Sequence, residues 1–124
     1  MKKFVLVLFS LILLSFDAAA KFSLIGTNLV GDKIYVDYDS AKIKDGLAKV
    51  WSFTVYSKSH QGVKSQKSLS QYDCQNETFS ILDITSFKDF AGTDIYEYRF
   101  DGPTKPKPVP PNSTLFTIMK DLCK

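Results

Sequence analysis

The chain has 124 residues, with 16 basic and 13 acidic side chains and a formal net charge of +3 at pH 7. This charge is too mild to indicate binding to nucleic acid or to an anionic membrane, both of which attract strongly basic patches. The sequence holds two cysteines and one histidine, and no repeat indicates a solenoid. Length and composition therefore predict one small globular domain.

The first 20 residues have the pattern of a secretory signal peptide. Two lysines precede an apolar run from Phe4 to Phe16 that only two serines interrupt, and Ala18-Ala19-Ala20 closes the segment. A membrane-spanning helix is the alternative, but a bilayer takes about 20 apolar residues and this run is shorter. We predict cleavage after Ala20, a domain over residues 21–124, export to the periplasm or the medium, and no membrane insertion after cleavage.

Beyond the signal peptide, apolar residues alternate with period two more often than with period 3.6, which predicts strands. Short runs rich in aromatic and β-branched residues are separated by turn-forming sequences, as in antiparallel sheets. The six predicted strands are residues 22–26, 33–38, 48–57, 66–74, 78–87 and 94–100.

Two of these strands have an alternation that predicts which side faces the core. In the strand at residues 48–57 the aromatic side is expected inside and Val50 outside. In the strand at residues 94–100 the aromatic side is also expected inside. The residues predicted to face the core are Trp51, Phe53, Val55, Tyr96, Tyr98 and Phe100.

All five prolines lie between residues 103 and 111, in the sequence PTKPKPVPP. Such a segment cannot form a helix or an inner strand, so we expect a stiff, extended connector. A helix should follow directly, because Asn112 or Ser113 can cap its first turn. The apolar face of this helix, at spacing i, i+3, i+4 and i+7, comprises Leu115, Ile118, Met119 and Leu122.

The two cysteines of an exported chain are expected to pair, because compartments outside the cytoplasm favour disulfides. Cys74 ends a predicted strand, and Cys123 is the next-to-last residue, on the edge of the apolar face of the helix. No C-x-x-C motif indicates redox chemistry. We therefore predict a structural Cys74–Cys123 disulfide that holds the C-terminal helix in register on the sheet.

The order of several short motifs resembles the surface-adhesin protein E-like family of exported bacterial domains. The motifs are IYVDYDSAKIKDGLAKVW at residues 34–51, YDC at 72–74, Pro111-Asn112-Ser113 before the helix, and Cys123 at its end. This order extends over nearly all of residues 21–124. The resemblance implies an α+β fold, in which a mostly antiparallel sheet of about six strands carries one C-terminal helix, packed on it and tied by a disulfide.

The same resemblance implies an exported binding module, adhesin-like toward host matrix or serum proteins such as laminin, vitronectin or plasminogen. Adhesive members of the family are commonly displayed by a lipid anchor on a cysteine, whereas the first residue after the predicted cleavage site is Lys21. The alternative is therefore a periplasmic protein that inhibits an enzyme or assists envelope assembly and has no host ligand. Oligomeric state stays open, because an edge strand can pair with another copy.

The polar stretch at residues 57–68 is the candidate contact loop for a protein partner. It carries Lys58, Lys64 and Lys67 between two predicted strands, and loops on a rigid scaffold often bind partners. The alternative interpretation is a solvated hairpin end that binds nothing. The histidine of this stretch, His60, is expected to be an exposed loop residue.

No pattern in the sequence indicates an enzyme or a cofactor. General acid–base and nucleophilic catalysis need a partnered group in a pocket, and the sequence around His60 provides none. Asp37 and Asp39 are similar to the start of a calcium loop. That loop requires glycine at its sixth position and glutamate at its twelfth, where this chain has Lys42 and Ala48. We predict a non-enzyme without cofactor or metal.

Overall fold

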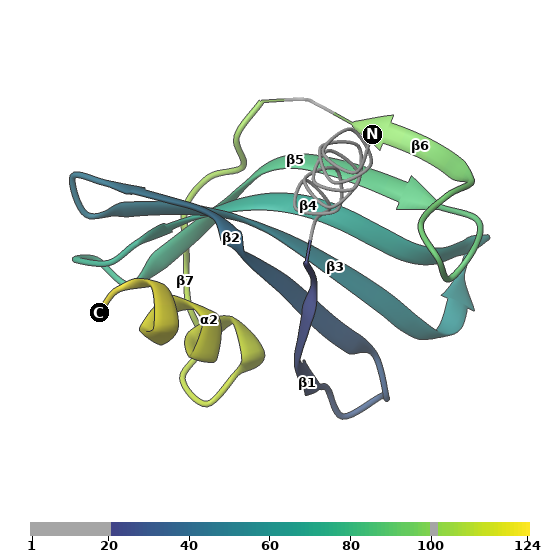
Figure 1. Ribbon diagram of the computed structural model, residues 1–124, viewed down its shortest axis with the longest axis horizontal. Helices are drawn as coiled ribbons and strands as arrows, with labels where there is room; N and C mark the ends of the chain where they lie inside the picture. Colours follow the sequence, from purple (N-terminus) through teal and green to yellow (C-terminus); the bar gives the residue numbers. More distant parts are fainter. Residues whose placement is uncertain (1–20, 100–101) are drawn as a thin grey trace, which may run out of the picture.

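Six strands in chain order form one antiparallel sheet, and a short helix lies against it (Figure 1). The computed structural model describes residues 21–99 and 102–124. Strand order is β1-β2-β3-β4-β5-β6, with a short β7 beside β5, so the predicted α+β fold is confirmed. The elements are β1 (Ser23–Thr27), β2 (Lys33–Lys44), β3 (Leu47–His60), β4 (Val63–Asp73), β5 (Thr78–Phe87), β6 (Ile95–Arg99), β7 (Lys107–Pro108) and α2 (Thr114–Leu122).

The six predicted strands are all present. Residues 78–87 match β5, while β2, β3 and β4 extend further than predicted. The predicted signal peptide at residues 1–20 and the inward-facing Phe100 lie outside the described residues, so both stay predictions. Within the described part of the chain, no helix has the length and apolar character needed to cross a membrane.

The β3–β4 hairpin is strand almost to its tip, which corrects the prediction of a polar loop at residues 57–68. β3 ends at His60 and β4 begins at Val63, so only Gln61 and Gly62 form the turn. Both have positive φ, 52° and 89°, the backbone that tight two-residue hairpins require and that glycine adopts without strain. Polar residues occupy both faces of this hairpin end, so hydrophobic alternation could not reveal the strands.

The core lies between one face of the sheet and α2. The helix buries Ile118, Met119 and Leu122, which confirms most of the predicted apolar face. Full burial of one such side chain stabilises by about 1.5–3 kcal/mol, whereas a nine-residue helix is marginal by itself, so tertiary packing holds α2 in place. The buried residues that α2 meets are Val36, Ala48, Val50, Tyr72 and Val109.

The predicted core face of β3 is wrong. Val50 is fully buried beneath α2, whereas Trp51 and Phe53 leave the opposite face and are half-buried. On that opposite face the ring of Phe53 packs against the rings of Phe22 and Phe87, with centroids 5.9 and 6.2 Å away. β3 therefore contributes side chains to two apolar clusters, the main core under the helix and a smaller aromatic cluster on the far side of the sheet.

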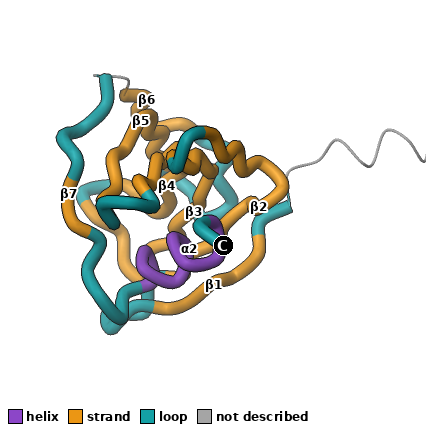
Figure 2. The backbone as a smooth tube through the Cα atoms, turned by 90° about the vertical axis from the view of Figure 1, so that its left-hand side faces the viewer, coloured by secondary structure: helices purple, strands orange, loops and turns teal. Residues whose placement is uncertain are grey.

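The sheet curls around α2, with β1 on one side of the helix and the β7 segment on the other (Figure 2). Close approach to β1 is possible because Gly26 has no side chain: a Cβ there would lie 3.4 Å from the Oγ1 atom of Thr114. On the other side, the predicted proline connector is an extended strap along β5. Val109 of this strap is buried in the core, and its backbone N–H donates to the Glu77 carbonyl at 2.9 Å.

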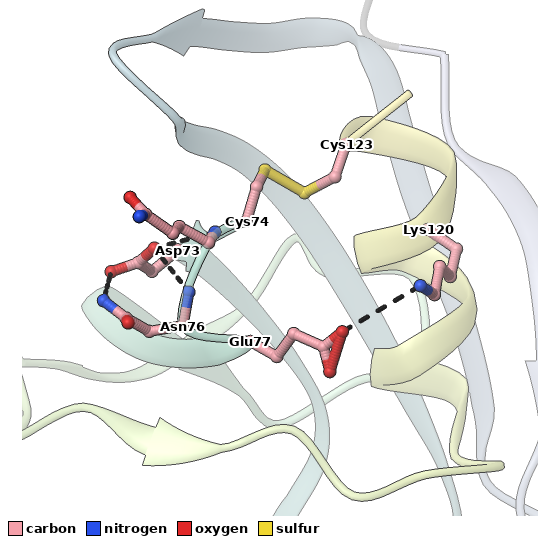
Figure 3. Close-up of a disulfide and its surroundings, with 7 residues drawn as sticks. Asp73, Cys74, Asn76, Glu77, Lys120 and Cys123 are labelled. Carbon is pink, nitrogen blue, oxygen red and sulfur yellow. Dashed lines mark hydrogen bonds and ion pairs between the residues drawn. A yellow bond between two sulfur atoms is a disulfide. The ribbon is translucent and has the colours of Figure 1, made fainter.

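Both ends of α2 are fixed by the contacts that the sequence predicts. Ser113 is the N-cap, and its Oγ atom accepts a hydrogen bond from the backbone N–H of Phe116 at 3.1 Å. At the other end, Cys123 forms the predicted disulfide with Cys74 in the turn after β4 (Figure 3). The Lys120 ammonium also lies 4.0 Å from the Glu77 carboxylate in that turn. Disulfide, cap and buried face together hold the helix on the sheet.

Candidate binding surface

The two ends of the sheet differ in how much of them is covered. The helix C-terminus and the disulfide lie beside the β2–β3 and β4–β5 turns, which a hydrogen bond joins from the Cys74 N–H to the Gly46 carbonyl. The β3–β4 turn and the β5–β6 loop lie at the opposite end, away from α2 (Figure 1). The three lysines predicted to contact a partner belong to the hairpin at this second end.

The hairpin spreads these lysines over its surface and does not gather them into one cluster. Lys58 is exposed near the tip of β3, and Lys64 and Lys67 are partly exposed on β4. Because successive side chains of a strand alternate between faces, residues 64 and 67 leave β4 on opposite sides. The structure therefore divides the predicted patch into an exposed tip and two faces.

Aromatic rings support two of these lysines. The Lys67 ammonium lies 4.7 Å from the centroid of the Trp51 ring, and the Lys64 ammonium lies 5.2 Å from that of Phe90. Attraction between a cation and an aromatic face stabilises such exposed contacts by about 0.5–1 kcal/mol. Both ammonium groups thus have a preferred position at the surface, although the pairing of a lysine with a distant ring could not be read from the sequence.

Asp32 anchors the β1–β2 turn to the hairpin. Its buried carboxylate accepts hydrogen bonds from the Asn28 side-chain amide at 3.0 Å and from the backbone N–H and hydroxyl of Ser57 at 2.9 and 3.3 Å. The Asn28 amide, followed by the Ser57 donors, holds the pKa of Asp32 below its usual value of 3.8. The Asp32 carboxylate therefore holds the β1–β2 turn against Ser57, the residue before Lys58.

The anchored turn exposes two apolar side chains that sequence reasoning missed. Leu29 is fully exposed and Val30 is 69% exposed. The Ser57 hydroxyl donates to the Val30 carbonyl at 2.6 Å, so this apolar tip lies directly beside β3. The available signal was an apolar pair inside the turn sequence TNLVGD, where polar residues are usual.

The prediction that the aromatic side of β6 faces inward is wrong. Tyr96 is 48% exposed and Tyr98 is 60% exposed, and every residue of β6 is exposed. β6 is the outermost strand of the sheet and pairs with the end of β5, and its full exposure shows that no described part of the chain covers its faces. The hydroxyl of Tyr98 donates to Asp83 at 3.3 Å, which leaves its ring at the surface.

His60 is exposed, as predicted, although it ends a strand and does not lie in a loop. Its ring meets the ring of Tyr56 edge-on, with centroids 4.8 Å apart. The two aspartates considered as metal ligands differ in burial: Asp37 is buried and Asp39 is exposed. Within residues 21–99 and 102–124, no three His, Cys, Asp or Glu side chains are grouped to hold a metal ion.

Comparison with known proteins agrees with this architecture. Protein E of Haemophilus influenzae, in a second crystal form, superposes with a TM-score of 0.62 at 14% identity, covering 86% of this chain and 90% of that one. Another structure of the same protein gives a TM-score of 0.61, with 86% of each chain covered. At this identity the likeness shows the fold alone. No curated protein matches the sequence.

The family comparison shows more than the fold. The model of the family "Surface-adhesin protein E" matches residues 22–124, which is nearly the whole described domain. That family comprises surface adhesins, which are exported or surface proteins and not enzymes. The chain belongs to the surface-adhesin protein E family.

Proposed function

We propose that the chain is an exported, adhesin-like binding module that captures a host matrix or serum protein such as laminin, vitronectin or plasminogen. The observation that carries this proposal is the family match over residues 22–124. Membership supports an adhesin-like module with a protein partner in general, and the three named ligands extend that to the host proteins bound by adhesive members of the family. The domain acts by binding and performs no catalysis.

The contact surface proposed for the partner is the end of the sheet at the β3–β4 hairpin, together with the β1–β2 turn. Leu29 and Val30 supply an exposed apolar centre, and Lys58 supplies a charge at its rim. Protein interfaces commonly combine a small apolar core with a polar rim of this kind. The Asp32 hydrogen bonds hold the two segments together before a partner arrives, which lowers the cost of ordering them on binding.

Lys64 and Lys67 can show which face of the hairpin a partner covers. Since they leave opposite faces of β4, a partner that covers the tip from one side touches only one of them. Lys67 belongs to the face that carries Trp51, and Lys64 lies over Phe90 in the β5–β6 loop. Comparing the two lysines therefore identifies the face against which the partner docks.

Surface plasmon resonance with immobilised laminin, vitronectin or plasminogen tests the proposal. The chain from Lys21 onward is compared with Lys58→Glu, Lys64→Glu and Lys67→Glu, singly and combined. Lys44→Glu, where β2 ends at the opposite end of the sheet, is the charge-matched control. We expect saturable binding that the triple variant weakens, mainly through slower association at low salt, while the control is unaffected.

Two results would overturn different parts of this assignment. If the unmodified domain binds none of the three ligands, the proposed adhesin function is wrong for them. If it binds and the triple variant binds equally well, the function stands and the lysine surface is wrong. Fractionation of the producing cells addresses location, since recovery from the periplasm alone favours the inhibitor or envelope-assembly alternative over a role in host contact.

A further inference from the structure

A polar groove of about 420 Å³ lies between the tip of the β3–β4 hairpin and β6. Gln66 of β4 and Ser86 of β5 line it together with the apolar Val63 and Ile84, and its sides are formed by His60 at the hairpin tip and by Tyr96, Glu97 and Arg99 of β6. We propose that this groove binds a neutral saccharide, a ligand class separate from the protein partner proposed above.

A row of polar side chains crosses the groove, in positions fixed by strand register. Gln66 pairs with Ser86 across β4 and β5, and Ser86 pairs with Glu97 across β5 and β6, so the three side chains lie in line on one face. The Gln66 amide accepts from the Tyr56 hydroxyl at 3.3 Å and donates to the Ser86 hydroxyl at 3.4 Å. These contacts orient the amide and use one of its two N–H donors and one of its acceptor positions.

The walls combine a charge pair with an aromatic ring. The Arg99 guanidinium donates to the Glu97 carboxylate at 2.7 Å, so the charge of Glu97 is partly neutralised at the wall of the groove. The Tyr96 ring lies against the hairpin tip, with its Cε2 atom 3.5 Å from the position a Cβ on Gly62 would take. The ring thereby forms a half-exposed platform at the mouth of the groove.

This lining selects a ligand by its chemistry. An aliphatic or lipid-like ligand needs apolar walls, but the exposed lining here is mostly polar, in contrast to three other hollows of the described structure. A phosphate or other strong anion needs net positive charge, which Glu97 removes. Saccharides instead present hydroxyl groups that both donate and accept, and flat C–H faces that pack on aromatic rings, and they match the amide, hydroxyl, charge pair and ring found here.

The test is an NMR titration of the 15N-labelled domain with neutral disaccharides, N-acetyllactosamine and mannobiose, and with inorganic phosphate as the anionic probe. We expect at least one disaccharide to shift the backbone resonances of Gln66, Ser86 and Glu97, with phosphate leaving them unchanged. Tyr96→Ala should weaken that binding about tenfold, the effect of losing one aromatic contact. Tyr98→Ala is the matched control, because Tyr98 is exposed on the same strand and does not line the groove.

Three results would overturn the proposal: no shift with either disaccharide, shifts located outside the groove, or equal affinity for Tyr96→Ala and the unmodified domain. A response to phosphate that matches the response to sugar would also exclude selection for a neutral ligand. The outcome is independent of the lysine experiment, because the titration contains no host protein and alters no lysine.

Discussion

Loss of the Cys74–Cys123 disulfide should destabilise the domain by about 4 kcal/mol, according to the chain-entropy relation for a closed loop. The bond joins residues with a sequence separation of 49. A loop of this length greatly restricts the unfolded chain, and releasing it favours unfolding. Because small domains are stable by only about 5–15 kcal/mol in total, the bond supplies a large share of the stability. The helix should be the first element to detach, since without the bond it is held by three buried side chains, the Ser113 cap, the Tyr38–Asp121 hydrogen bond and the Lys120–Glu77 ion pair.

Guanidinium unfolding of the Cys74→Ser/Cys123→Ser double variant measures this effect without leaving a reactive thiol. Trp51 is the single tryptophan of the chain and reports on the sheet by fluorescence, while far-UV circular dichroism reports on the helix. The reduced unmodified domain is the control and should unfold with the double variant. A double variant within about 1 kcal/mol of the oxidised domain, at unchanged slope, would refute the reasoning.

Three further predictions concern single side chains. Ser113→Ala removes the helix cap and should lower the free energy of unfolding by about 1 kcal/mol in the same assay, with no change expected if the cap is irrelevant. Gly92→Ala should cost about 2–3 kcal/mol and Gly46→Ala about 1 kcal/mol. Both glycines have positive φ, 73° and 76°. Of the two, only Gly92 would bring an added Cβ against a neighbour, the Phe53 ring at 2.8 Å. Equal losses of stability in the two variants would therefore contradict a clash with Phe53. Asp32→Asn should destabilise the domain at neutral pH. Folding lowers the pKa of Asp32, so its contribution to stability is present above pH 3.8 and is lost as pH falls through the lower folded-state pKa. The difference in stability between Asp32→Asn and the unmodified domain should therefore vanish in acid. A difference that stays constant with pH would contradict this assignment.

The C-terminal helix and its disulfide could be predicted because their signals are local. Prolines end before residue 112, a serine that can cap follows, and apolar residues recur at helical spacing up to Cys123. Export then supplies the reason for the two cysteines to pair. The same locality explains why residues 78–87 were located correctly, since that run is rich in β-branched and aromatic residues and has turn-forming sequences on both sides.

The faces of β3 and β6 could not be predicted, because they depend on what covers each strand in three dimensions. Val50 and Phe53 are both apolar and lie on opposite faces; only the position of α2 decides that Val50 belongs to the main core. Tyr96 and Tyr98 alternate as an inward face would, yet no layer of the described chain packs on β6. Alternation identifies a strand and its two sides, and tertiary contacts select the side that is buried.

The role of the three lysines in binding a partner stays a prediction, and the structure describes only where they lie. The hairpin and its three lysines are at the surface, but their separation onto two faces follows from strand character that polar residues concealed. Leu29 and Val30 were missed because an apolar pair in a turn has no strand or helix periodicity. Their exposure indicates a contact surface because they lie beside Lys58. The hydrogen bonds of Asp32 hold the β1–β2 turn against β3, two segments distant in sequence.

Amide hydrogen exchange of the domain, with and without a saturating host ligand, tests the central claim that the hairpin end of the sheet captures a protein partner. The predicted result is slower exchange at residues 28–32 and 57–68, with unchanged exchange in α2 and the β2–β3 turn. Protection confined to α2 and the disulfide end, or no protection anywhere in the presence of laminin, vitronectin and plasminogen, would contradict the account.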